Sequence, residues 1–290
     1  MDQVRIQHNS FCHYLLASFL TSLALSAPVH ALESALELRD VYSRTVDRQL
    51  ILPEDEQHYY AELLMFQLHK AGLNSLPAQY MLMVDRNPNV QAAMLFWLAE
   101  NGQLELIGAS PASTGKGGGY DYFETPLGIF EHTIKNMDFR AEGTKNKLGL
   151  MGYGNKGMRV YDFGWVMARK TWTPEIGEMR LQLHSTDLLR LEPSLGKVQS
   201  RGCIRIPATL NKLLDHYGVL DAEYENAINN KKIIQVLDPE REKNPWPGRY
   251  MLVVDSRRVT RPDWSPLPIV QKNSNGKLNP EFSPGSDKIN

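Results

Sequence analysis

The amino-acid sequence predicts a mainly-β α+β domain with a helical segment in front of it. Three observations lead to this fold class. Between residues 80 and 256, short apolar runs alternate with turn residues, whereas residues 33–74 carry apolar side chains at helical spacing. The chain of 290 residues is 42% apolar and 22% charged, which is typical of a globular protein with a sizeable core. We therefore expect one or two domains rather than a disordered or fibrous chain.

The helical segment is assigned to residues 32–79. Pro53 is followed by three acidic residues, a pattern typical of a helix start because proline and negative charge both suit the first turn. Leu64 and Leu68 then recur on one face, and Gly72 ends the pattern. We expect this segment to pack on the domain or to bind a protein partner, and no motif in it identifies that partner.

The main domain is assigned to residues 80–256. Asn101-Gly102 between two apolar runs is a strong hairpin signal. A helix with an apolar stripe is expected between Pro207 and Gly218. The many glycines between Lys135 and Lys170 indicate long loops. The expected strands are 80–84, 90–99, 104–107, 125–130, 179–184, 231–237 and 250–254. Residues 257–290 are rich in Pro, Ser, Asn and Gly, which predicts an extended tail.

Residues 1–31 have the features of a secretory signal peptide. Arg5 precedes an uncharged apolar run, and Val29 and Ala31 supply small residues at the expected cleavage site. The run is shorter than the ~20 residues of a membrane span, so we expect no stable span after removal, with an uncleaved anchor as the alternative. A bacterial protein exported in this way would act in the periplasm. The formal charge of −1 gives no reason to expect a nucleic-acid partner.

Removal of residues 1–31 would also remove Cys12 and leave Cys203 as the single thiol. Unpaired cysteines are uncommon in exported proteins, because oxidising compartments pair or damage free thiols. A buried structural thiol is one explanation. The other is a nucleophile, since Gly202 precedes Cys203 and allows close backbone approach to a substrate. His184 lies on the polar face of an alternating strand, where it is available as a base.

The segment Ser200-Arg201-Gly202-Cys203-Ile204-Arg205, with fifteen residues separating His184 from Ser200, resembles the signature of the YkuD-type L,D-transpeptidases. Thr125-Pro126-Leu127-Gly128-Ile129-Phe130 is similar to a second strand motif of that family. The resemblance covers roughly residues 80–256 and implies a YkuD-like catalytic core of β-sandwich or barrel type. Two positions depart from the family pattern. Arg201 stands where many members have histidine, and Ser185 stands where many have glycine.

The resemblance implies a role for each matching residue. Cys203 would be the nucleophile and His184 its base, with the Ser185 carbonyl holding the imidazole. The Gly202 and Cys203 amides would be oxyanion donors, and Ser200 would shape the turn. Arg205 would bind a substrate carboxylate, with Arg201 beside it. The substrate would be the peptidoglycan stem peptide, with no cofactor and no metal ion.

Four other activities are weighed against this one. The same site would act as an L,D-carboxypeptidase if water accepted the acyl group. A serine enzyme of the penicillin-binding type would use Ser113-x-x-Lys116 or Ser194-x-x-Lys197, but no Lys-Thr-Gly triad accompanies either tetrad. A metallopeptidase lacks its motif, because His184 and Asp187 make only two ligands. The last is a cell-wall binding module without turnover. Acylation of the thiol by a carbapenem-type β-lactam separates that module from the cysteine enzyme.

Overall fold

The computed structural model describes Met1 and residues 34–267. The predicted signal peptide beyond Met1, and the tail beyond residue 267, lie outside the described residues. The elements are, in chain order, α1 (Glu37–Thr45), α2 (Glu54–Lys70), β1 (Gln79–Asp85), β2 (Ala92–Leu98), β3 (Leu104–Pro111), β4 (Gly128–Glu131), β5 (Phe139–Arg140), β6 (Arg159–Arg169), β7 (Ile176–His184), the 3-10 turn η1 (Glu192–Ser194), β8 (Ile204–Arg205), α3 (Ala208–His216), α4 (Ala222–Asn226), α5 (Lys231–Val236) and β9 (Tyr250–Val254).

The strands form two sheets. The first has five strands in the order β3-β2-β1-β9-β4, and the second has four in the order β5-β6-β7-β8. Pairing is antiparallel except between β1 and β9 and between β7 and β8. More residues lie in strands than in helices, so the predicted mainly-β α+β class is confirmed. Within the described residues, no helix is long and apolar enough to cross a membrane.

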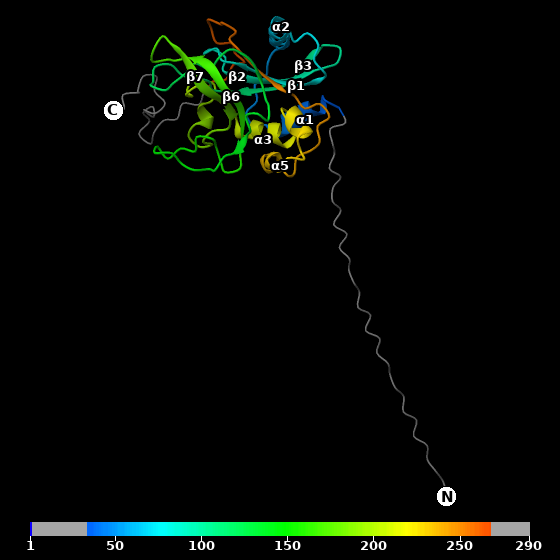
Figure 1. The fold of residues 1–290 in the computed structure, drawn as a ribbon. Coiled ribbons are helices and arrows are strands. Elements are labelled where there is room, and N and C mark those ends of the chain that lie inside the picture. Colours follow the sequence, from blue (N-terminus) through cyan, green and yellow to red (C-terminus); the bar gives the residue numbers. More distant parts are fainter. Residues whose placement is uncertain (2–33, 268–290) are drawn as a thin grey trace.

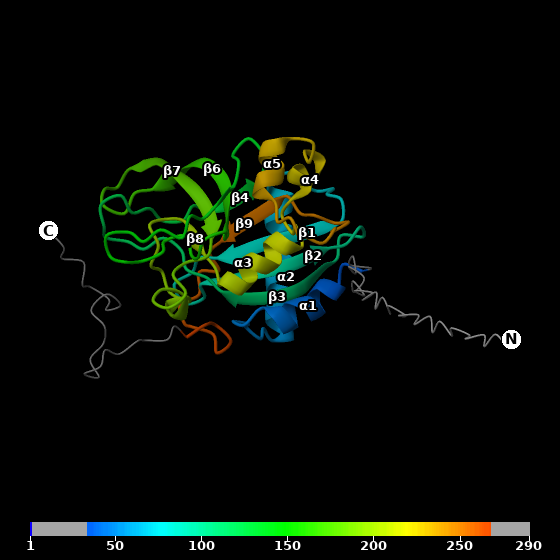
Figure 2. The ribbon, with the colours of Figure 1, turned by 90° about the horizontal axis from the view of Figure 1, so that it is seen from below.

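The helices cover both faces of the five-stranded sheet (Figures 1 and 2). On one face α2 buries Tyr60, Leu64 and Leu68 against β1, β2 and β9. On the other face α1, α3 and the second sheet share one larger core. The predicted helical segment therefore contributes buried side chains to both cores, because each amphipathic helix needs an apolar surface to cover.

Several predicted elements are confirmed. The Asn101-Gly102 turn joins β2 to β3, with Gly102 at φ +82° in the left-handed region where glycine carries no steric penalty. In β7, Leu181 and Leu183 are fully buried as the alternating pattern predicts. Helix α3 follows Pro207 directly, so it begins at Ala208, five residues after Cys203.

Two predictions about secondary structure are wrong. Residues 231–237 were expected to form a strand, but they form helix α5, which Asn230 caps by accepting a hydrogen bond from the Lys232 amide. A short apolar run fits either structure, and here Ile233 and Val236 share the buried face. The glycine-rich region 135–170 was expected to be loops, yet it contains β6, the longest strand. A register shift between Asp162 and Trp165 interrupts the alternation that would have revealed it.

The described part of the predicted tail, residues 257–267, has no helix or strand but packs on the domain. The Trp264 ring meets the Tyr60 ring edge-on at 5.8 Å between centroids. Ser265 is 4% exposed, and its hydroxyl donates to the Asn89 carbonyl at 2.7 Å. This stretch is therefore part of the folded domain rather than an extension from it.

A buried charge cluster joins the second sheet to the loops around it. Arg159 at the start of β6 is fully buried and forms ion pairs of 2.7 Å with both Asp138 and Asp221. His132 bonds the same Asp138 carboxylate at 2.9 Å, and the amide of Asp162 donates to it at 2.8 Å. The guanidinium offsets part of the cost of burying these carboxylates.

We expect Arg159→Met to destabilise the protein by about 3–5 kcal/mol, because it removes the guanidinium that pairs with buried Asp138 and Asp221. The matched control is Arg39→Met, whose ion pair with Glu105 is about half exposed and should cost no more than about 1 kcal/mol. Chemical denaturation measures both. Equal effects of the two substitutions would contradict the structural role of the cluster.

Candidate functional site

The short parallel pairing of β7 with β8 sets the relative positions of Cys203 and His184. Leu183 pairs with Ile204, and His184 pairs with Arg205. Paired residues in neighbouring strands project to the same face, and residues two apart on a strand share a face. His184, Arg205 and Cys203 therefore face one side of the sheet, while the fully buried Leu183 and Ile204 face the core.

The loop that carries Cys203, residues 196–205, is fastened along its length to residues 112–125. The amide of Ser113 donates to the Arg205 carbonyl at 2.9 Å, and the amide of Ser200 donates to the Thr114 carbonyl at 3.0 Å. The Thr125 hydroxyl donates to the Gly202 carbonyl at 2.6 Å and accepts from the Gly115 amide at 2.8 Å. The backbone on both sides of the cysteine is thus held by hydrogen bonds to residues distant in sequence.

Ser200 and Gly202 shape the turn itself. The Ser200 hydroxyl bonds the Cys203 carbonyl and accepts from the Gly202 amide at 3.1 Å. Gly202 has φ +132°, and a side-chain carbon there would lie 2.7 Å from Met179 Cε. The Gly202 amide already has a partner, which makes the Cys203 amide the better oxyanion donor of the two predicted.

The His184 imidazole is oriented from two sides. Its Nδ1 bonds the Ser185 carbonyl, so Nε2 is the ring nitrogen that remains to exchange a proton. The Tyr153 ring packs edge-on against the imidazole, with centroids 4.8 Å apart. The Ser185 hydroxyl donates to the Tyr153 carbonyl at 3.0 Å, so the tyrosine loop and the histidine strand are tied together.

The Cys203 thiol lies beside β7, where it donates to the Arg180 carbonyl at 3.5 Å. Beside it, Gln182 and Arg180 both bond Asp162 Oδ2, at 2.9 Å and 2.7 Å respectively. The Tyr153 hydroxyl donates to Gln182 Oε1 at 2.9 Å and completes the chain of bonds. The wall next to the thiol is therefore built from side chains whose hydrogen bonds fix their positions.

Two arginines face the same site. Arg205 forms no ion pair with any carboxylate of the described residues, and its buried Nε has no hydrogen-bond partner there. Arg201 is exposed and stacks over the Tyr122 ring at 5.2 Å. A buried guanidinium nitrogen without a partner is costly, so the geometry at Arg205 favours an external anion.

Burial keeps the thiol and the imidazole neutral in the resting protein. Desolvation raises the pKa of the Cys203 thiol above its ordinary value, although the positive charge of Arg205 opposes this. Desolvation, helped by the same arginine, lowers the pKa of His184 to about 3. The pair therefore rests as thiol and imidazole rather than as thiolate and imidazolium.

The serines of the two Ser-x-x-Lys tetrads are placed differently. Ser113 is fully buried, and its hydroxyl accepts from Gln199 at 3.0 Å. Ser194 is 1% exposed and donates to the Leu191 carbonyl at 2.7 Å. Neither hydroxyl is presented to a substrate. Asp187 caps the following turn by accepting from backbone amides, and residues 34–267 hold no cluster of three or more potential metal ligands.

Tyr153, Gln182, Arg180, Asp162 and Thr125 belong to the site but were not predicted as site residues. Gln182 and Arg180 share the polar face of β7 with His184, so the alternating pattern contained a signal for them. Tyr153 lies in a glycine-rich loop without periodicity, and nothing in its local sequence indicates a contact with His184.

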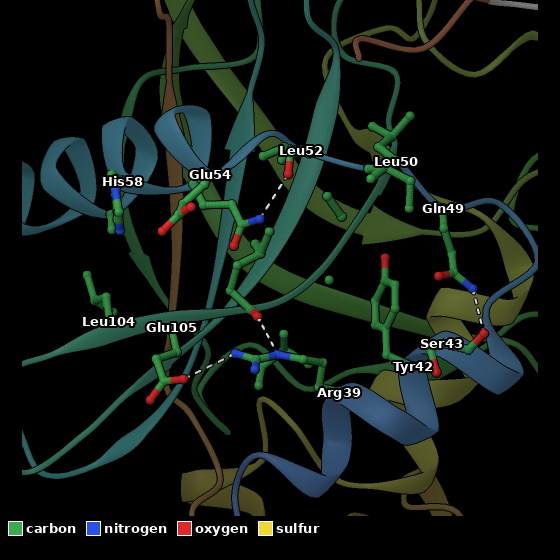
Figure 3. A pocket seen from close by; sticks show the side chains of 17 residues that line it. Arg39, Tyr42, Ser43, Gln49, Leu50, Leu52, Glu54, His58, Leu104 and Glu105 are labelled. Carbon is green, nitrogen blue, oxygen red and sulfur yellow. Dashed lines mark hydrogen bonds and ion pairs between the residues drawn. The ribbon is translucent and has the colours of Figure 1, made fainter.

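A separate hollow of about 510 Å³ lies between α1, α2 and the edge strand β3 (Figure 3). Arg39 crosses its floor, with Nε donating to the Leu106 carbonyl at 2.9 Å and Nη2 to Glu105 at 3.3 Å. Its lining includes Glu54 and His58 but no thiol, so it does not form part of the Cys203 site.

No known protein-family model matches the chain, and no curated protein matches it. Among solved structures, the chain is similar to the helical cell shape determining protein Pgp2 from Campylobacter jejuni. The identity is 13%, the TM-score is 0.29, and the match covers 80% of this chain and 59% of that one. The chain thus spans less than two thirds of that structure's length, and a TM-score this low does not establish a shared fold.

We expect Gly202→Ala to lower the melting temperature and slow modification of Cys203, because an L-residue at φ +132° forces the cysteine turn to shift. Gly117→Ala is the control, since an added carbon there meets nothing within 4 Å and its backbone is not left-handed. Melting curves and thiol-labelling rates test both. A Gly202→Ala protein that matches Gly117→Ala would contradict the strain argument.

We expect the rate of Cys203 alkylation to rise steadily between about pH 6 and pH 9, because only the thiolate reacts and its pKa is raised. Iodoacetamide labelling of a Cys12→Ser variant measures the rate at Cys203 alone. His184→Ala should leave the shape of the profile unchanged, since the imidazole is already neutral across this range. An inflection near neutral pH that disappears in His184→Ala would instead indicate a resting thiolate–imidazolium pair.

Proposed function

We propose that the protein is an L,D-transpeptidase of the YkuD type that acts on peptidoglycan stem peptides through a thioester at Cys203. The observation that carries the proposal is the β7–β8 register, which puts the thiol and the imidazole on one face while Nδ1 of His184 is held by the Ser185 carbonyl. A nucleophile, an oriented base and a donor for the oxyanion are the parts that acyl transfer requires.

In the first half-reaction, Cys203 Sγ attacks the carbonyl carbon of the scissile amide while its proton moves to His184 Nε2. The carbonyl oxygen becomes an oxyanion beside the Cys203 amide. Collapse of this intermediate breaks the C–N bond, and the departing amine takes the proton back from Nε2. The products are a thioester at Cys203 and a free amine.

In the second half-reaction, an acceptor amine gives its proton to Nε2 and attacks the thioester carbonyl. The C–S bond then breaks, the sulfur recovers the proton, and a new amide is released. Water in place of the amine gives the L,D-carboxypeptidase reaction at the same site. An amine and water would both react through His184 Nε2 and the thioester at Cys203, so the arrangement of these groups favours neither acceptor.

Arg205 supports a substrate that carries a carboxylate close to the scissile bond. Its partnerless Nε lies on the face of the thiol, and a guanidinium binds a carboxylate with two parallel hydrogen bonds. Stem peptides have free carboxylates of this kind. The exposed Arg201 offers a second positive charge at the rim.

The periplasm is the proposed location, because peptidoglycan lies there and residues 1–31 have the pattern of a signal peptide. A serine mechanism is disfavoured, since Ser113 and Ser194 are buried and hydrogen-bonded. A cell-wall binding module without turnover requires neither a thiol nor an oriented imidazole on one face of the sheet.

We expect the protein without residues 1–31 to convert purified muropeptides into cross-linked or shortened products, detected by mass spectrometry. Cys203→Ser should keep the fold and abolish turnover, because the change is nearly isosteric. His184→Ala should slow turnover by at least roughly 10²-fold, the lower end of what general base catalysis supplies.

Thr209→Ser serves as the matched control, since it keeps a hydroxyl on α3 away from the thiol. It should turn over at the parent rate. Product formation by Cys203→Ser at a rate close to the parent's would overturn the proposed nucleophile. Loss of the folded state in His184→Ala without a specific rate effect would make the histidine a structural residue.

A further inference from the structure

A second hollow lies two backbone segments away from Cys203. It is lined by Gly117, Glu124, Pro174 and residues 169–173. Residues 122–124 run between this hollow and the cysteine loop. The Phe123 amide donates to the Arg201 carbonyl at 3.1 Å on one side, and the Glu124 amide donates to the Arg169 carbonyl at 3.0 Å on the other. Two strand spacings amount to roughly 10 Å, which a substrate bound at the thiol can span.

Trp172 lines the hollow, and other aromatic rings contact it. Tyr120 is 83% exposed and lies at 5.5 Å from the Trp172 ring, centroid to centroid. Trp172 is in turn fixed by an edge-on contact with the buried Phe123 at 5.1 Å. Tyr122 is stacked under Arg201 of the cysteine loop. The Trp172 ring is thus held by the core, and the Tyr120 ring is exposed to solvent.

Two ion pairs and an arginine, Arg169, supply the charged groups around the hollow. Lys170 pairs with Glu175 at 2.9 Å, and Glu124 pairs with Arg86 at 3.5 Å. The hydroxyls of Thr171 and Thr173 lie between them. An aromatic ring beside threonine hydroxyls and charged side chains suits a polar ligand that has one apolar face.

The backbone of the hollow argues against an added peptide strand. The amides of Lys170 and Thr171 already donate to the carbonyls of Glu175 and Tyr122, both at 3.0 Å. A peptide strand needs unpaired main-chain groups at an edge, and these groups are engaged. A pyranose ring needs only a flat aromatic face for its C–H groups and side chains for its hydroxyls.

We propose that Tyr120 and Trp172 form a sugar-binding subsite that takes the glycan strand to which the stem peptide is attached. The inference rests on the proposed function for the identity of the sugar and deepens it. The preferred substrate is then the glycan-linked stem rather than the free peptide, because both parts are held at once and the second contact is intramolecular.

The test uses binding that needs no turnover. A Cys203→Ala protein is titrated calorimetrically with the β-1,4-linked tetramer of N-acetylglucosamine. We expect binding that Tyr120→Ala weakens roughly tenfold, the scale on which alanine removes a ring-stacking contact, and that Tyr120→Phe preserves. Phe66→Ala is the control, since Phe66 is 61% exposed on α2, away from the hollow.

Absence of binding, or binding that Tyr120→Ala and Phe66→Ala affect equally, would overturn the subsite. Muropeptide turnover in the parent protein is measured in parallel. Turnover without sugar binding would leave the proposed function standing and reject the subsite. Sugar binding that depends on Tyr120, without turnover, would support the subsite and reject the enzyme.

Discussion

The candidate site depends on one short contact, the parallel pairing of β8 with the end of β7. Only Leu183–Ile204 and His184–Arg205 are paired, yet a slip by one residue would turn His184 and Cys203 to opposite faces of the sheet. Two buried residues, Leu183 and Ile204, oppose such a slip because it would carry them out of the core. The hydrogen bonds of Thr125 and residues 113–116 hold the same loop from its other side.

The burial of the groups around this contact has consequences for its chemistry. The imidazole and the thiol are both desolvated, so the resting pair carries no charge while Arg205 beside it does. A thiol that stays protonated until a substrate arrives is less exposed to oxidation, since oxidation follows thiolate character. Deeper in the sheet, Asp162 links this region to the Arg159 cluster through the bond from its amide to Asp138. The site is thus linked by hydrogen bonds to the buried charge cluster around Arg159.

The sequence predicted the mainly-β α+β class, whereas its assignment of the site residues stays a prediction. Cys203, His184 and Arg205 stand in a local motif, and the alternation of β7 indicates which face each occupies. Strand β6 was missed because its bulge breaks the two-residue period of buried side chains. Helix α5 was mistaken for a strand because a short segment with a few apolar residues fits either structure. Tyr153 and the Tyr120–Trp172 pair lie in loops, where position depends on long-range packing that no local pattern encodes.

The central claim is that Cys203 becomes covalently acylated by a stem peptide. The most direct measurement is the intact mass of the protein after brief mixing with a tetrapeptide muropeptide and quenching in acid, which preserves thioesters. The account predicts a mass increase equal to the acyl fragment, mapped to Cys203 and absent from Cys203→Ser. An unmodified mass while substrate is being consumed, or an adduct on another residue, would contradict it.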